Sequence, residues 1–284
     1  MMKYKEFGSA FSPSPLQSAF DFCDFQYYWQ ASGNVLQNQW NSVCELFGSD
    51  FALVVWGTFI VTTLFYWTVG LCYTLVDLTG KPEFLQKYKI QKNANYPVSV
   101  SQVLKVALQV IINQLIFIPC GVLFYYSMVW RGYDSGKTLP SFRRLLFEVI
   151  IHTIMNETLF YYTHRLMHHP SIYKYVHKLH HEWTAPIAIT AIYCHPLEHI
   201  FGNVFSTLPS FLILGSHMSV CWFWFGVAMM FTINNHSGYH FPFMSSTPKF
   251  HDYHHMKFDQ NFGLLGFLDW IHETDLSYRK RKEY

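Results

Sequence analysis

Charged side chains are scarce in this chain of 284 residues. Asp, Glu, Lys and Arg make up 13% of the sequence, roughly half of the share of about 25% that is usual for a soluble domain. Hydrophobic residues account for 51% and aromatic residues for 19%. This composition excludes a disordered or fibrous protein, argues against a soluble globular one and leaves a polytopic membrane protein. The net charge of +2 is too small to indicate nucleic-acid binding.

Several common chemical motifs are also missing. The six cysteines are scattered and include no C-x-x-C pair, so they indicate neither a disulfide framework nor a cysteine metal site. No H-E-x-x-H, G-x-S-x-G, P-loop or G-x-G-x-x-G motif is present. Because the chain shows no nicotinamide or flavin motif, redox chemistry would need electrons from another protein. The first 50 residues contain no early apolar run, so no cleavable signal peptide is expected.

Long uncharged runs predict membrane-spanning helices, each of which needs about 20 predominantly apolar residues. We expect five of them, near 51–80, 106–130, 145–163, 200–214 and 218–235. The last two form a predicted hairpin that turns between Leu214 and His217. The stretch 145–163 is the least apolar, but its acidic residues, Glu148 and Glu157, lie nearer its ends than its middle.

These runs divide the chain into four parts. They are an N-terminal tail over 1–50, a spanning segment over 51–80, a catalytic domain over 81–276 and a basic tail over 277–284. Five lysines and one acidic residue lie between Lys81 and Lys105, which places that segment in the cytosol by the positive-inside rule. Whether or not 145–163 spans, the histidine-rich segments then face the cytosol. Lys280 and Lys282 resemble a dilysine signal for the endoplasmic reticulum; a basic terminus at the membrane surface is the alternative.

The most unusual feature of the sequence is its histidine content. Eleven of the 16 histidines lie within 164–181 and 236–255, where an even distribution would place about two. Their spacings are i, i+3 and i+4, which put side chains on one face of a helix. Imidazole binds zinc, copper, iron and nickel. Ten histidines are too many for one ion and suit two: His164, His168, His177, His180, His181, His236, His240, His251, His254 and His255.

Further residues are candidates for supporting roles. Glu157 lies seven residues before His164, on nearly the same helical face, so we expect its carboxylate to orient a ligand imidazole. The acids beside ligand histidines, Asp252 and Glu182, are candidates for the same role. His169 and His195 are additional candidate ligands. Aromatic residues near the clusters are expected to wall a substrate pocket: Tyr161, Tyr162, Trp183, Tyr193 and Tyr239.

Three histidine boxes resemble those of the fatty acid hydroxylase/sterol desaturase superfamily. They read HRLMHH at 164–169, HKLHH at 177–181 and HDYHH at 251–255. Four further phrases resemble the sterol C4-methyl oxidase branch: HEWTAP at 181–186, HPLEH at 195–199, HSGYHFP at 236–242 and LDWIHETD at 268–275. The resemblance covers roughly residues 85–276.

This resemblance implies an integral enzyme of the endoplasmic reticulum membrane with a dinuclear metal centre. The metal would be iron in function, although zinc can occupy such a site in an isolated protein. The enzymes of this superfamily use O2 and electrons, commonly from NAD(P)H through cytochrome b5 or a reductase. The resemblance implies the ten ligands named above. His240 is the least secure of these ligands, because methyl sterol oxidases can carry another residue at this position. His195 is then the candidate replacement.

The sequence thus predicts an all-α polytopic membrane protein with a cytosolic, histidine-rich helical cap over a transmembrane bundle. The expected activity is hydroxylation of a lipid, most simply a sterol at its C4 methyl group. The histidine boxes do not encode the substrate, so a fatty-acyl or sphingolipid hydroxylase or desaturase is an alternative. Two other classes stay open, a zinc-dependent membrane hydrolase and a non-catalytic sterol-binding relative.

Overall fold

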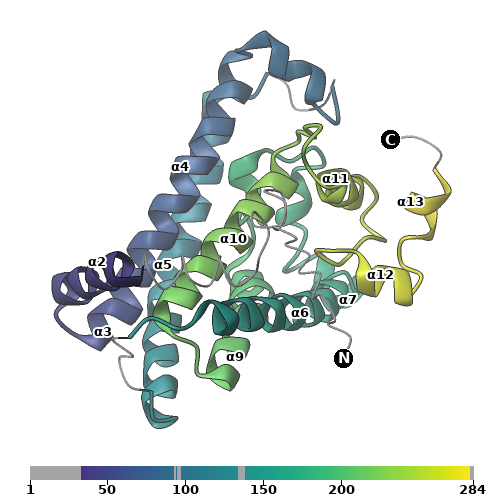
Figure 1. Ribbon diagram of the computed structural model, residues 1–284. Coiled ribbons are helices and arrows are strands. Elements are labelled where there is room, and N and C mark those ends of the chain that lie inside the picture. Colours follow the sequence, from purple (N-terminus) through teal and green to yellow (C-terminus); the bar gives the residue numbers. More distant parts are fainter. Residues whose placement is uncertain (1–32, 93, 95–96, 134–137, 282–284) are drawn as a thin grey trace, which may run out of the picture.

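The computed structural model describes residues 33–92, 94, 97–133 and 138–281, and in these ranges every regular element is helical (Figure 1). The α-helices are α2 (Gly33–Phe47), α3 (Asp50–Ala52), α4 (Thr58–Thr79), α5 (Val100–Trp130), α6 (Phe142–Met167), α7 (Pro170–Tyr173), α8 (Pro196–Glu198), α9 (Phe205–Leu214), α10 (Met218–His236), α11 (Thr247–Lys257), α12 (Phe267–Ile271) and α13 (Leu276–Lys280). Short 3-10 or π turns are η2 (Leu53–Gly57), η3 (Glu83–Tyr88), η4 (His180–Glu182), η5 (Ala188–Thr190) and η6 (His199–Val204). The predicted all-α class is confirmed.

Within the described ranges, three helical stretches are long and apolar enough to cross a membrane: Asp50–Thr79, Val100–Trp130 and Pro196–Leu214. They coincide with the segments predicted near 51–80, 106–130 and 200–214. Large apolar side chains such as Leu64 and Leu108 are more than 60% exposed on them, as expected for a surface in contact with lipid chains.

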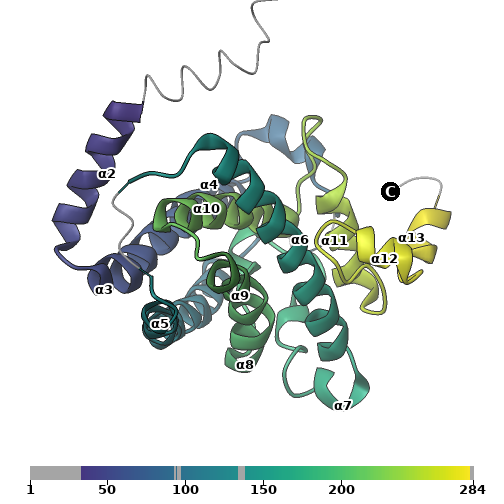
Figure 2. The same cartoon turned by 60° about the horizontal axis from the view of Figure 1, so that its bottom comes forward.

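The segments predicted near 145–163 and 218–235 also form helices, α6 and α10, but they are not among these three stretches. α6 carries a row of buried polar side chains that includes Glu148, His152 and Glu157, which lowers its apolar content. Both helices pack within the bundle, α6 against α9 and α10 against α4 (Figures 1 and 2).

Local sequence signals explain where several of these helices begin and end. Ser99 and Gln102 form a capping box at the start of α5, satisfying backbone N–H groups that have no partner in the first turn. Gly215 ends α9 in the left-handed conformation, with a φ of 61° that favours glycine. His217 then accepts a hydrogen bond from the Ser219 N–H at the start of α10. The hairpin turn predicted between Leu214 and His217 is therefore present.

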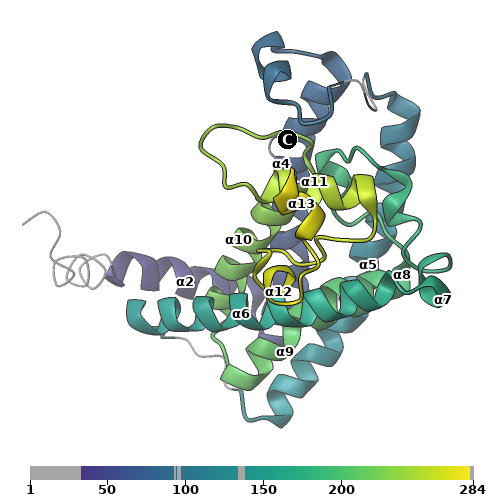
Figure 3. The ribbon, with the colours of Figure 1, turned by 90° about the vertical axis from the view of Figure 1, so that its right-hand side faces the viewer.

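The C-terminal segments complete the fold around the ends of α6 and α10. α11 packs against α10, and α12 lies against α6 (Figure 3). Asp269 of α12 accepts hydrogen bonds from the Phe262 and Gly263 N–H groups, which fixes the loop between α11 and α12. The same loop contacts α6, because Glu157 accepts hydrogen bonds from the N–H groups of Leu264 and Leu265.

A buried ion pair ties the end of α4 to the segment that follows α10. Lys89 Nζ lies 2.8 Å from Asp77 Oδ1, and both side chains are less than a tenth exposed. The Tyr239 hydroxyl donates a hydrogen bond to the same carboxylate oxygen. Lys89 and Tyr239 also form an isolated antiparallel backbone bridge. The segments 88–90 and 238–240 are therefore held side by side, which matters below for the position of His240.

Replacing Asp77 by alanine is expected to destabilise the fold by about 3–5 kcal/mol, because the buried charge of Lys89 would lose the carboxylate that compensates it. Unfolding of the purified protein in detergent, followed by circular dichroism, measures the change. The double variant D77A/K89M removes both charges and is expected to recover most of the loss. A D77A variant as stable as the wild type would contradict this role of the ion pair.

Candidate metal centre

Nine of the ten histidines expected to be ligands come together in two buried or nearly buried groups. The first histidine group consists of His164, His168, His177, His181 and His254. The second histidine group consists of His180, His236, His251 and His255. Within each group, one ring nitrogen from every residue lies within 4.8 Å of the others. The rings come from the end of α6, the segment before and within η4, the end of α10 and the length of α11.

The two groups adjoin because two of the histidine boxes contribute to both of them. In HKLHH, His177 and His181 belong to the first group and His180 to the second. In HDYHH, His254 belongs to the first group, whereas His251 and His255 belong to the second. Residues four apart on a helical turn point the same way, whereas neighbours point about 100° apart. The ring centroids of His181 and His255, one from each group, are 4.7 Å apart.

Backbone carbonyl groups determine which ring nitrogen carries the proton. Because a carbonyl oxygen can only accept a hydrogen bond, a histidine Nδ1 that lies within hydrogen-bond distance of one must carry the proton, leaving Nε2 with a free lone pair. Five ring nitrogens have such a partner: His164 Nδ1 with Phe262 O, His180 Nδ1 with Tyr193 O, His236 Nδ1 with Thr232 O, His254 Nδ1 with Gln260 O and His255 Nδ1 with Trp183 O.

The free lone pairs face one another. The Nε2 atoms of His180 and His236 are 3.3 Å apart, and neither carries a proton that it can donate to the other. Two lone pairs at this distance repel each other unless a cation lies between them. Seven Nε2–Nε2 distances in the two groups fall between 3.0 and 3.3 Å. Adjacent nitrogen ligands about 2.1 Å from one metal ion are separated by roughly 3.0–3.4 Å, so both groups fit a metal ion.

Burial keeps these imidazoles neutral. It lowers the pKa of His180 to about 4 and that of His164 to about 3, because a charged ring would lose its hydration. The pKa values of His181, His254 and His255 are also well below the ordinary range, for the same reason. At neutral pH the rings are therefore in the form that binds metal ions.

Sequence reasoning missed the carboxylate that contacts the first histidine group. Glu198 Oε1 lies 2.9 Å from His177 Nδ1, and both side chains are less than a tenth exposed. A carboxyl group this close to Nδ1 is placed as the outer carboxylates of metal-bound histidines are, which orient the ring. The HPLEH phrase at 195–199 carries the signal, since it places this acid within three residues of two histidines.

The three acids predicted for that role contact other groups. Glu157 accepts hydrogen bonds from backbone N–H groups of the 262–265 loop and so supports His164 only through the Phe262 carbonyl. Asp252 accepts a hydrogen bond from Gln91. Glu182 is partly exposed and accepts hydrogen bonds from Lys105 and Tyr193. Among the described contacts, none joins these acids directly to a ring of either histidine group.

Three of the candidate ligand histidines lie outside both groups. The backbone bridge between 88–90 and 238–240 holds His240, whose N–H donates to the Tyr88 carbonyl, and its ring belongs to neither group. His169 and His195 each precede a proline that begins a short helix, α7 or α8. Their Nδ1 atoms accept hydrogen bonds from backbone N–H groups in the first turn, so these rings act as helix caps.

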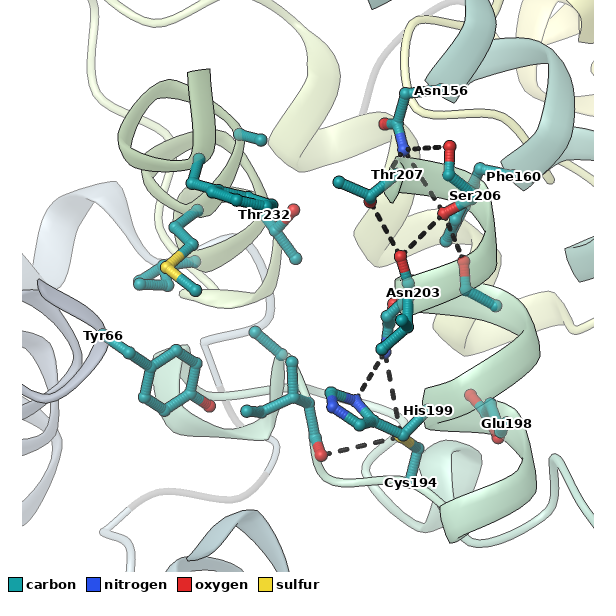
Figure 4. Close-up of a pocket in the computed structure, with 18 of the residues that line it drawn as sticks. Tyr66, Asn156, Phe160, Cys194, Glu198, His199, Asn203, Ser206, Thr207 and Thr232 are labelled. Atoms are coloured by element: carbon teal, nitrogen blue, oxygen red, sulfur yellow. Dashed lines mark hydrogen bonds between the residues drawn. The ribbon is translucent and has the colours of Figure 1, made fainter. Parts of the chain in front are cut away.

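A largely apolar cavity of about 160 Å³ adjoins the two histidine groups (Figure 4). Five histidines of the two groups line it: His164, His177, His180, His236 and His251. Its aromatic walls are Phe59, Tyr66, Phe117, Phe160, Trp224 and Phe225. A polar strip on one side comes from α6, η6 and α9, where Asn156 donates hydrogen bonds to Ser206 and Thr207. A cavity of this kind suits an apolar molecule with a few polar groups.

None of the five aromatic residues predicted to wall the pocket lines this cavity. Tyr161 is buried against α12, where its ring stacks on His272, while its neighbour Phe160 faces the cavity. Tyr162 is half exposed. The other three are buried elsewhere: Trp183 in the hydrophobic core, Tyr193 with its hydroxyl on Glu182 and Tyr239 with its hydroxyl on Asp77. Proximity in sequence to a ligand did not predict which way a side chain points.

The fold and the site define a helical membrane protein in which two adjacent histidine groups open onto an apolar cavity. Comparison with known sequences agrees, since the model of the fatty acid hydroxylase family matches residues 149–274. Fatty acid hydroxylase domain-containing protein 2 of Macaca fascicularis is 42% identical over 261 residues, covering 91% of this chain and 78% of the relative. The chain belongs to the fatty acid hydroxylase family.

Two other relatives have different names. A very-long-chain aldehyde decarbonylase of Oryza sativa subsp. indica is 31% identical over 258 residues, covering 87% of this chain and 94% of the relative. Methylsterol monooxygenase 2-1 of Arabidopsis thaliana is 29% identical over 272 residues, covering 88% of this chain and 97% of the relative. No solved structure matches the chain.

Proposed function

We propose that this protein is a membrane-bound oxygenase that hydroxylates a lipid with O2 at two iron ions held by the two histidine groups. The observation that carries the proposal is the set of Nε2 atoms facing one another at 3.0–3.3 Å beside an apolar cavity. When bound, two iron ions supply the oxidising power that cleavage of an unactivated C–H bond requires and that side chains lack. Zinc can take the same histidine sites in an isolated preparation.

The chain's own residues have three tasks in this proposal. Neutral imidazoles hold the two ions, and backbone carbonyls fix the orientation of five of the rings. Glu198 orients His177. The aromatic walls bind the lipid and exclude water from the reacting carbon, which prevents side reactions.

A sterol with a C4 methyl group is the substrate we propose. The phrases HPLEH at 195–199 and HSGYHFP at 236–242 support it, as does the related methylsterol monooxygenase. The name of the rice relative, an aldehyde decarbonylase, favours a second candidate, a long-chain acyl lipid. The electrons would come from NAD(P)H through cytochrome b5 or a reductase, since the sequence carries no nicotinamide or flavin motif of its own.

The proposed location is the endoplasmic reticulum membrane, with the histidine groups on the cytosolic side. The lysines between Lys81 and Lys105 support this orientation through the positive-inside rule. Lys280 ends α13, while Lys282, the second residue of the dilysine pattern, lies outside the described residues.

The test is an assay with labelled oxygen. Purified protein in detergent, reconstituted with iron without air and supplied with a reducing system, is expected to bind about two iron ions per chain. Given a 4,4-dimethylsterol and ¹⁸O2, it should form a product that carries the label, detected by mass spectrometry. Less than one iron ion per chain, together with no O2-dependent product, would overturn the proposal.

Lipid profiling separates the substrate candidates. A knockout that accumulates 4-methylsterols supports the sterol, whereas a loss of hydroxylated acyl lipids supports the second candidate. Full rescue of the knockout by a chain that lacks both His180 and His254 would favour a non-catalytic role over either enzyme.

A further inference from the structure

His199 is a buried histidine that belongs to neither histidine group, yet it lines the same cavity. Its side chain comes from η6, and Figure 4 shows the imidazole projecting from that element toward the side of the cavity on which Tyr66 lies. The residue is 6% exposed. Among the described residues, its Nε2 atom has no hydrogen-bond partner. A buried polar atom without a partner is costly in free energy and needs an explanation.

The neighbour of this ring identifies the unpaired atom as a donor. Asn203 Nδ2 lies 3.3 Å from His199 Nδ1, and the same amide nitrogen points toward the sulfur of Cys194. An amide nitrogen can only donate, so His199 Nδ1 accepts and the ring proton lies on Nε2. The cavity is therefore lined by an N–H donor that has no acceptor among the described residues.

This donor lines the same cavity as five histidines of the two histidine groups. The preceding residue, Glu198, contacts His177 of the first histidine group. An atom bound by His199 would therefore lie in the same cavity, of about 160 Å³, that these proposed ligands line.

We propose that His199 recognises an oxygen atom of the substrate, through a hydrogen bond from Nε2–H to a hydroxyl or carbonyl group close to the carbon that is oxidised. The inference rests on the proposed function, in which this cavity binds the lipid. It names the substrate class as a lipid with an oxygen near its reacting carbon, in contrast to a plain hydrocarbon chain. A site built around a buried hydrogen-bonding group strongly disfavours an analogue that lacks the matching group.

The experiment compares matched lipids that differ by one oxygen. The first pair is a 4,4-dimethylsterol and its 3-deoxy analogue, and the second is a long-chain fatty aldehyde and the corresponding alkane. Equilibrium binding of each tritiated lipid to iron-loaded full-length protein in detergent gives the affinities. The wild type is expected to prefer the oxygenated member of one pair by about tenfold or more. The pair that shows the preference distinguishes a sterol hydroxyl from an acyl carbonyl.

The variants test whether His199 is the source of that preference. H199F is expected to bind both members of the pair equally, and H199Q, which keeps an N–H donor, should recover part of the preference. H195N is the matched control, because His195 caps a helix outside the cavity and asparagine can replace it as a cap. The iron content of every variant should equal that of the wild type. If H199F does not fold, the smaller H199L carries the same comparison.

Two results would overturn the inference. One is a wild type that binds both members of each pair equally, and the other is an H199F variant that keeps the full preference. Failure of the proposed function has a different signature. A preference that H199F loses, in a protein that forms no oxygenated product from any of these lipids, would sustain the role of His199 and reject the oxygenase.

Discussion

Replacing His254 by asparagine is expected to remove one of two iron ions, and replacing His251 by asparagine is expected to remove the other. The two residues are three apart in one box, yet they belong to different groups. Loss of a direct ligand should lower oxygenase activity by at least about 100-fold, since even partners outside the ligand shell are worth 10–100-fold. Iron per chain, measured by mass spectrometry after reconstitution without air, and product formation check the prediction.

His240 provides the matched control for this experiment. It is a histidine of the same sequence pattern, but its backbone is bridged to the 88–90 segment and its ring lies outside both groups. H240N should therefore retain both ions. If H240N lost an ion while H251N kept two, the grouping of the histidines described here would be wrong.

Substituting glutamine for Glu198 should weaken the first histidine group alone. The change preserves the size of the side chain but replaces the carboxyl group beside His177 Nδ1 by an amide. We expect the affinity of that group for Fe²⁺ to fall by about 10–100-fold, with the second group unaffected. Titration with Fe²⁺ against a competing chelator, which resolves a tight and a weakened site, measures the effect.

E182Q and E157Q complete the comparison. Glu182 is partly exposed and paired with Lys105, so E182Q should bind both ions as the wild type does. Glu157 contacts the 262–265 loop, so E157Q should lower thermal stability more than metal affinity. An E157Q variant that lost the tight site, beside an E198Q variant that kept it, would restore Glu157 as the acid that orients a ligand.

Part of the site was predictable because it depends on local pattern. Repeated i, i+3 and i+4 spacing already places several imidazoles on one side of a turn, whichever way the helices pack. The spacing does not predict which ring belongs to which histidine group, because group membership depends on the relative rotation of α6, α10 and α11. Nor could the pattern show that His240 lies outside both groups. Its i, i+4 spacing from His236 places the two rings on one face only if the helix continues past His236. α10 ends at His236, so the spacing has no helical face to act on.

The amino-acid sequence by itself determined the helical class, the apolar stretches that can span a membrane, the turn at Gly215 and the histidine content of the centre. These properties follow from composition and short-range spacing. Only the tertiary structure decided that Glu198 contacts His177, that Phe160 and Trp224 line the cavity while Tyr161 and Tyr239 do not, and that His199 offers an unpaired donor. The reason is directional: neighbouring side chains on a helix diverge by about 100°, so which one reaches a partner depends on how distant segments pack.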